Sequence, residues 1–241
     1  MYTDSILTGD RHEAETAARL PIGFGGLFAG VMPATVKSLE DPDGQGRIKV
    51  ALAAVPDPDN AACEIWARVA TLFAGNNRGS WFMPDEGDEV LIAFEQGDPR
   101  RPYVLGGLWN GVDKPSQSAS KANNIKSITS RNGVVITLDD SQGQETLKLE
   151  TPGGQTVTLK DGPGQIEIKD SNGNSVKLEA SGISIDAASR LSINAPQISI
   201  SSSMISVDAG MSNFSGVVRA DTVICNSIIA ASYTPGAGNI W

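Results

Sequence analysis

The chain of 241 residues contains few of the side chains on which most enzymes and metalloproteins depend. It has one histidine, His12, and two cysteines, Cys63 and Cys225, which lie far apart in the sequence. Two isolated thiols make no disulfide framework and cannot supply a tetrahedral metal site within one chain. Because no histidine lies near a serine or cysteine, triad-type nucleophilic catalysis is unsupported. We therefore expect no catalytic residue, no metal site and no cofactor, and a protein that is not an enzyme.

Excess positive charge and long apolar runs are also missing. The net charge is −9, and residues 27–111 carry seven Lys and Arg against twelve Asp and Glu, which argues against nucleic acid as a partner. No apolar run approaches the roughly 18 residues that cross a bilayer. The first 20 residues lack a basic segment followed by an apolar one, so the sequence predicts no signal peptide.

Aromatic side chains are absent from a large part of the chain. Eight of the thirteen lie between Phe28 and Trp109, and the next 104 residues contain none. Two regions with such different core chemistry should form two different structures. The polar stretch 112–125, which contains Pro115, is predicted to be the linker between them.

The first region is predicted to be an N-terminal arm over 1–26 followed by a small barrel over 27–111. The glycines at 23–26 match no phosphate-binding spacing, and we interpret them as a hinge. From there short strands alternate with turn signals, and Ile48, Val50 and Leu52 should point inward together. Five or six such strands without a convincing helix indicate a closed barrel.

Several blocks of this region resemble one known family. Residues 87–111 (GDEVLIAFEQGDPRRPYVLGGLWNG), with GRIKV at 46–50 and IWARVA at 65–70, are similar to the OB-fold signature of the phage baseplate assembly protein V and VgrG spike family. The resemblance implies an OB-fold that docks on a baseplate hub. From the residues themselves, we expect Arg100 and Arg101 to pair with nearby acids in a tight turn, and Trp81 and Phe82 to be core or interface aromatics.

The second region consists of repeated aliphatic pairs at positions i and i+2, each on one face of a predicted strand. These pairs, predicted to be the trimer core, are Ile136/Leu138, Leu147/Leu149, Val157/Leu159, Ile166/Ile168, Val176/Leu178, Ile183/Ile185, Leu191/Ile193, Ile198/Ile200 and Ile205/Val207. The distance from one pair to the next is 9 to 11 residues at first and then 7 to 8. This regularity is typical of a β-repeat.

An apolar face this narrow must be covered by something. One chain can coil on itself as a β-solenoid, or three chains can build a prism, and the spacing alone does not separate these. The resemblance favours the prism, because a triple-stranded β-helix follows the OB-fold in that family. The predicted fold is therefore all-β, with an OB-fold barrel followed by a trimeric intertwined β-helix over 126–215. Nine levels at ~4.7 Å would make a needle of roughly 40–45 Å.

The last segment, 216–241, regains apolar residues and is predicted to be the tip. Tyr233, Pro235, Ile240 and Trp241 form either a plug that closes the prism or a platform for a separate PAAR-type tip protein, as relatives of this family have. Some of these spikes hold an iron ion through a His-x-His pair, which this chain lacks.

The sequence thus predicts a structural, membrane-piercing central spike of a contractile injection machine such as a phage tail, a tailocin or an extracellular injection system. Its expected partners are two further copies, the hub, a tip protein and the target envelope. It would be made in the cytoplasm as a component of the particle. The alternatives are a tailspike with glycan-binding or hydrolase activity, for which the acidic residues 85–89 offer no evident cleft, and a monomeric β-solenoid adaptor.

Overall fold

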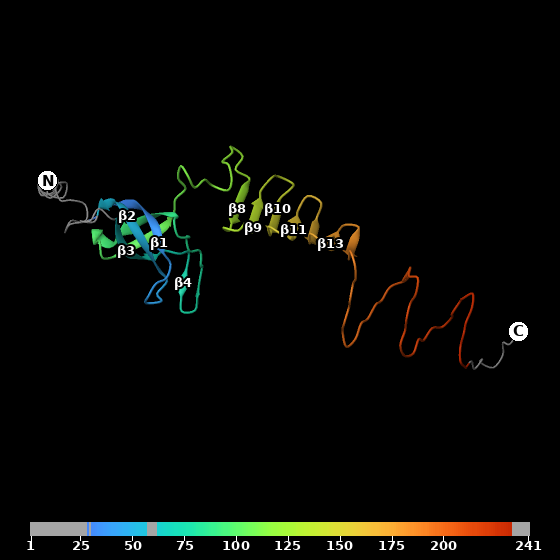
Figure 1. The fold of residues 1–241 in the computed structure, drawn as a ribbon. Coiled ribbons are helices and arrows are strands. Elements are labelled where there is room, and N and C mark those ends of the chain that lie inside the picture. The colour runs from blue at the N-terminus through green and yellow to red at the C-terminus, as the bar shows by residue number, and fades with distance from the viewer. Residues whose placement is uncertain (1–27, 29, 57–61, 233–241) are drawn as a thin grey trace, which may run out of the picture. The chain divides into compact units, whose positions relative to one another are not determined.

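The computed structural model describes residues 28, 30–56 and 62–232, and almost all of its regular structure is strand (Figure 1). By backbone contacts the chain divides into two units, Met1–Ala188 and Ser189–Trp241. The arm 1–26, with its hinge and His12, lies outside the described residues. No helix in the described ranges is long and apolar enough to span a bilayer.

Five strands close into a barrel in the order β1-β2-β3-β7-β6. All neighbours are antiparallel except β3 and β7, which run parallel. The strands are β1 (Val31–Ser38), β2 (Arg47–Pro56), β3 (Ala62–Val69), β6 (Glu89–Phe94) and β7 (Pro102–Gly107). A five-stranded closed barrel is the architecture of the OB-fold, so this part of the fold prediction is confirmed.

The barrel core is aliphatic and continuous. Ile48, Val50 and Leu52 are buried, as the alternation in β2 predicts. The rings of Phe28 and Phe94 stack with their centroids 4.6 Å apart. The other buried members of this cluster are Ala34, Val36, Ala67, Val90, Ile92 and Val104. Trp66 lies on the outer face of β3, where Lys49 Nζ approaches its ring centroid to 5.2 Å.

A two-stranded hairpin of β4 (Ala74–Gly75) and β5 (Arg78–Gly79) leaves the barrel between β3 and β6. The sequence analysis did not identify it as a strand pair, because two-residue strands carry no alternation. The 3₁₀ turn η1 (Glu95–Gly97) joins β6 to β7.

A seven-stranded antiparallel meander follows, in which each strand pairs only with its neighbours in sequence. Its strands are β8 (Ile125–Thr129), β9 (Val135–Asp139), β10 (Thr146–Glu150), β11 (Thr156–Lys160), β12 (Gln165–Lys169), β13 (Ser175–Glu179) and β14 (Gly182–Asp186). We call this sheet the ladder. Within one chain its strands take their backbone partners from their neighbours in sequence, and the trimeric column over 126–215 stays a prediction.

Residues 189–232, which we call the distal segment, contain no strand or helix (Figure 1). The last three aliphatic pairs of the sequence pattern lie in it. The regular structure therefore stops after the sixth of nine predicted pairs.

Candidate functional site

The aliphatic pairs of the ladder form two unbroken rows across its strands. Because every hairpin keeps the register, each aliphatic side chain stands opposite another on the next strand. The first row contains Leu138, Leu147, Leu159, Ile166, Leu178 and Ile183. The second contains Ile128, Ile136, Leu149, Val157, Ile168, Val176 and Ile185.

Ile128 is a member that the sequence analysis missed. It pairs with Ile136 and extends the second row onto β8. The corresponding position in the first row is Lys126, which pairs with Leu138. This lysine breaks the i, i+2 pattern by which the other pairs were identified.

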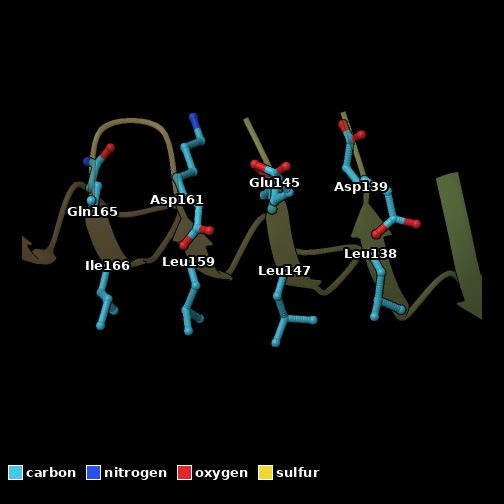
Figure 2. A pocket seen from close by; sticks show the side chains of 12 residues that line it. Leu138, Asp139, Glu145, Leu147, Leu159, Asp161, Gln165 and Ile166 are labelled. Carbon is cyan, nitrogen blue, oxygen red and sulfur yellow. The ribbon is translucent and has the colours of Figure 1, made fainter. Parts of the chain in front are cut away.

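Both rows project from the same face of the ladder. Figure 2 shows Leu138, Leu147, Leu159 and Ile166 pointing to one side, away from Asp139, Glu145 and Gln165. Alternation along a strand requires this arrangement once the register is fixed. We call this surface the aliphatic face.

The aliphatic face is uncovered in the single chain. Ile136 is 37% exposed, Ile168 50% and Ile183 73%, whereas only Val157 and Val176 among the two rows of β9–β14 are half-buried. Two rows of large aliphatic side chains far exceed the scattered apolar exposure that is normal for a soluble surface. Such a surface indicates a protein interface.

The opposite face of the ladder is polar. Its central row is Ser127, Thr137, Lys148, Thr158, Glu167, Lys177 and Ser184. Lys177 Nζ lies 3.6 Å from Glu167 Oε1 on the neighbouring strand. The two faces therefore have opposite character, one suited to burial and one to water.

An open hollow of about 500 Å³ lies along one end of β9–β12 (Figure 2). Its lining includes the carboxylates of Asp139, Asp140, Glu145 and Asp161. Hydrogen bonds from the Ser141 hydroxyl and backbone N–H lower the pKa of Asp139, so this group stays ionised. A glycosidase requires a carboxylic acid with a raised pKa, and Asp139 does not provide it. Among the described residues, no group of three His, Cys, Asp or Glu side chains is placed to hold a metal ion.

The remaining predicted site residues are not brought together in the structure. Leu191, Ile193, Ile198, Ile200, Ile205 and Val207 lie in the distal segment and are all exposed, from 55% at Ile198 to 73% at Val207. The predicted tip residues Tyr233, Pro235, Ile240 and Trp241 lie outside the described residues.

The turn after β6 is held by the ion pairs that the sequence suggested. Arg100 Nη2 lies 2.9 Å from Asp98 Oδ2, and Arg101 Nη1 lies 3.0 Å from Glu95 Oε1. Tyr103 Oη donates a hydrogen bond of 2.6 Å to Glu95. Hydrogen bonds from the Arg100 side chain and backbone N–H lower the pKa of Asp98 from 3.8 to about 2. The two arginines thus form ion pairs within the turn.

This pKa shift predicts a pH-dependent contribution to barrel stability. Because the pKa of Asp98 is lowered in the fold, its contribution is complete above about pH 4 and is lost as the pH falls through about 2. We expect Asp98→Asn to lower the barrel's Tm slightly at pH 6, and the difference from wild type to vanish as the pH approaches 2. Thermal denaturation of both proteins between pH 6 and pH 2 measures this difference in Tm. A difference in Tm that does not change with pH would contradict the prediction.

A second ion pair was not predicted from sequence. Asp41, in the turn between β1 and β2, accepts a 2.6 Å bond from Arg47 Nη2 and a 2.8 Å bond from the backbone N–H of Gln45. The Arg47 guanidinium holds the pKa of Asp41 well below its usual range. The Asp-Pro-Asp-Gly sequence predicts a turn, but not which basic residue closes it.

The hairpin region carries four exposed large apolar side chains. Leu72, Phe73, Trp81 and Phe82 are 59% to 90% exposed. The Thr71 hydroxyl donates a 2.7 Å hydrogen bond to the Ser80 carbonyl, and the Ser80 N–H donates to Phe73 O at 3.1 Å, so the two arms are fixed to one another. Trp81 and Phe82 are not core residues, so that expectation is wrong, and the interface role stays a prediction. We call residues 72–82 the aromatic hairpin.

Two family models match the chain. Residues 32–109 match the type VI secretion system/phage-baseplate injector OB domain, and residues 146–211 match the phage baseplate V C-terminal trimerisation domain. The chain belongs to the baseplate V/VgrG-like spike family. The family predicted from the sequence blocks is therefore confirmed.

Individual spike proteins are similar over part of the chain. The type VI secretion system spike protein VgrG1c of Pseudomonas aeruginosa is 31% identical over 127 residues, which are 49% of this chain and 18% of the relative. VgrG1a of the same organism is 32% identical over 122 residues, 47% of this chain and 19% of the relative. The spike protein VgrG3 of Vibrio cholerae is 35% identical over 54 residues, 22% of this chain and 5% of the relative. The chain spans less than a fifth of the length of these curated relatives.

The match to the trimerisation domain supports a homotrimer for this spike-family chain. The matched range begins at β10, at the first residue of that strand, and continues past the end of the ladder into the distal segment. It therefore includes most of the aliphatic face.

Proposed function

We propose that the protein is the central spike of a contractile injection particle, and that three copies form a needle whose axis is lined by their aliphatic faces. The observation that carries this proposal is the uncovered aliphatic face within a range that matches a trimerisation domain. Burying an aliphatic side chain contributes about 1.5–3 kcal/mol, so three copies of two long rows provide a strong driving force for association. The needle would breach the target envelope mechanically when the particle contracts.

Sedimentation velocity tests the assembly. Three copies of the 25.2 kDa chain would sediment as a species of about 76 kDa. A species of 25.2 kDa would instead support a monomeric adaptor and would exclude a trimeric needle. The piercing role is then tested in particles: those carrying a spike that cannot trimerise should fail to permeabilise target cells, although the same particles with the unaltered spike succeed.

Docking on the baseplate hub is the role we propose for the barrel. The aromatic hairpin supports it, because exposed Trp and Phe on a fixed hairpin have the composition of interface hot spots. The arm 1–26 would add further hub contact.

Replacing Phe73 and Trp81 together by serine should weaken hub binding roughly 30-fold or more, since hot-spot aromatics contribute at least about 2 kcal/mol. Binding of the purified spike to the hub protein of its own particle measures this. Asn76→Ala, in the turn of the same hairpin, is the matched control and should bind almost normally, because Asn76 is exposed and asparagine is not among the residues enriched in hot spots. Equal binding by both variants would assign hub contact to another surface.

The C-terminal residues 233–241 are proposed to be a platform for a PAAR-type tip protein or a plug for the needle. If they are a platform, removing them should leave the trimer intact and abolish capture of the tip protein by the spike. Co-purification of the tip protein with the shortened spike measures this. Unchanged capture would exclude the platform and leave the plug.

A further inference from the structure

The outer face of the barrel carries a group of positive charges on β2 and β3. Alternation places four side chains outside at one end of this strand pair, because the residues between them, Ile48 and Ala67, are buried. These four are Arg47, Lys49, Trp66 and Arg68. Three of them are cationic, although the net charge of the chain is −9. On an acidic protein, such a place allows an acidic partner to approach.

Two of the three cations are paired with acids of the barrel itself. Arg47 Nη2 lies 2.6 Å from Asp41 Oδ1 and also pairs with Asp43. Lys49 Nζ lies 3.8 Å from Glu64 Oε2 on the neighbouring strand. The charges of Arg47 and Lys49 are therefore largely compensated within the fold.

The third cation, Arg68, is exposed and forms no ion pair with any residue that the structure describes. Glu95 is already engaged, because its Oε1 accepts a 3.0 Å bond from Arg101 and its Oε2 a 2.6 Å bond from Tyr103. Arg68 also stands directly opposite Arg47 in the β2–β3 register. Like charges opposite one another destabilise a strand pair, so the barrel gains no stability from the charge of Arg68 through this pairing.

Arg68 is nevertheless held in a defined position. Its Cζ lies 5.5 Å from the centroid of the Tyr103 ring, the residue beside it on β7. The ring is itself fixed, since the Tyr103 hydroxyl donates its hydrogen bond to Glu95. A guanidinium that rests on a fixed ring loses little further freedom on binding, and its planar fork of N–H donors matches a carboxylate.

Arg68 lies at the same end of β2 and β3 as the aromatic hairpin. The hairpin begins shortly after β3 ends. The ring of Trp81 lies against Gly46, where a Cβ would stand 3.6 Å from the ring atom Cζ3. Gly46 immediately precedes Arg47, which pairs with Arg68. The exposed arginine and the exposed aromatic side chains therefore belong to one end of the barrel.

We propose that Arg68 binds a carboxylate of the baseplate hub, so that the docking surface of the barrel combines the aromatic hairpin with one positioned arginine. This inference rests on the proposed hub docking and adds the chemistry of the hub surface, which presents an aspartate or glutamate beside an apolar pocket. A carboxylate is favoured over the phosphates of a nucleic acid, because residues 27–111 carry seven Lys and Arg against twelve Asp and Glu and repel a polyanion.

Binding of the full-length spike to the hub protein of its own particle tests the inference. Arg68→Gln should weaken binding roughly 10-fold to 100-fold, which is the contribution of a hydrogen bond to a charged group. Arg68→Lys should bind with intermediate affinity, since lysine keeps the charge and loses the fork. Raising the salt concentration should weaken binding of the wild type more than binding of Arg68→Gln.

Lys169→Gln is the matched control, because it removes the same charge from an exposed position on the ladder. This variant should bind the hub as the wild type does. If Arg68→Gln also binds as the wild type does, or if both variants are weakened equally, the role of Arg68 is overturned.

The hairpin variant described above separates this result from a failure of hub docking. If replacing Phe73 and Trp81 weakens binding and Arg68→Gln does not, the inference about the arginine fails and the docking role of the barrel stands. If neither change weakens binding, the hub contacts another surface and both proposals fail.

A single-stranded DNA oligonucleotide tests the alternative partner. It should bind the wild type and Arg68→Gln equally weakly, as expected for an acidic barrel. DNA binding by the wild type that Arg68→Gln abolishes would assign the arginine to phosphate and overturn the inference.

Discussion

Replacing Ile185 by aspartate should convert the trimeric spike into monomers. Ile185 stands at the end of the second aliphatic row, opposite Val176, and is 56% exposed in the single chain. On the proposed axis the substitution would bring three carboxylates together away from water. Burying an ion costs several kcal/mol, so three copies would destabilise the trimer by on the order of 10 kcal/mol. Sedimentation velocity and thermal denaturation measure the loss.

The control for this experiment is the neighbouring residue. Ser184 lies on the polar face and pairs with Lys177, so Ser184→Asp places a carboxylate beside an ammonium group in water. This variant should remain trimeric and as heat-resistant as wild type. If Ile185→Asp behaves like Ser184→Asp, the aliphatic face is not the trimer interface.

Replacing Ile92 by alanine should unfold the barrel at a much lower temperature without dissociating the needle. Ile92 is fully buried in the barrel core. Removing a large aliphatic side chain from such a site costs about 2–5 kcal/mol, because part of the cavity remains. A loss of about 3 kcal/mol corresponds to a fall in Tm of roughly 12–24 °C for a domain of this size.

Tryptophan fluorescence can follow the barrel, which contains Trp66, while sedimentation follows the trimer. Leu105→Ala is the control, because Leu105 is 49% exposed and its truncation should change Tm only slightly. A barrel that melts normally after Ile92→Ala would contradict the core described above. Dissociation of the trimer at native temperature would show that barrel and needle depend on each other.

Much of the fold was accessible from sequence because it depends on local alternation. The inward side chains of β2 and the aliphatic pairs of β9–β14 follow from a period of two, which is present in any strand with one buried face. The register of the ladder stays the same from strand to strand because the hairpins that join the strands are tight. The β4–β5 hairpin was not predicted, since two residues are too few to show a period.

Alternation does not predict which chain a strand pairs with. The same pattern occurs whether the neighbouring strand belongs to the same chain or to another copy. The pairs at 176/178 and 191/193 look alike in sequence, yet only the first lies in a strand of the structure. The distinguishing signal is the turn residue: Gly182 permits a reversal, and no equivalent glycine follows Leu191 before Gly210. The Asp41–Arg47 ion pair was missed for a related reason, since it depends on how β1 and β2 are brought together.

The antiparallel register of the ladder also determines how this sheet responds to load. Its seven strands are spaced about 4.8 Å apart, so the stack is roughly 29 Å long in the direction of its backbone hydrogen bonds. Compression along that direction presses neighbouring strands against one another over their whole length, whereas a pull at the two ends of the chain would separate the strands one hairpin at a time. In the proposed spike, a forward thrust would load the ladder in compression and retraction would load it in tension.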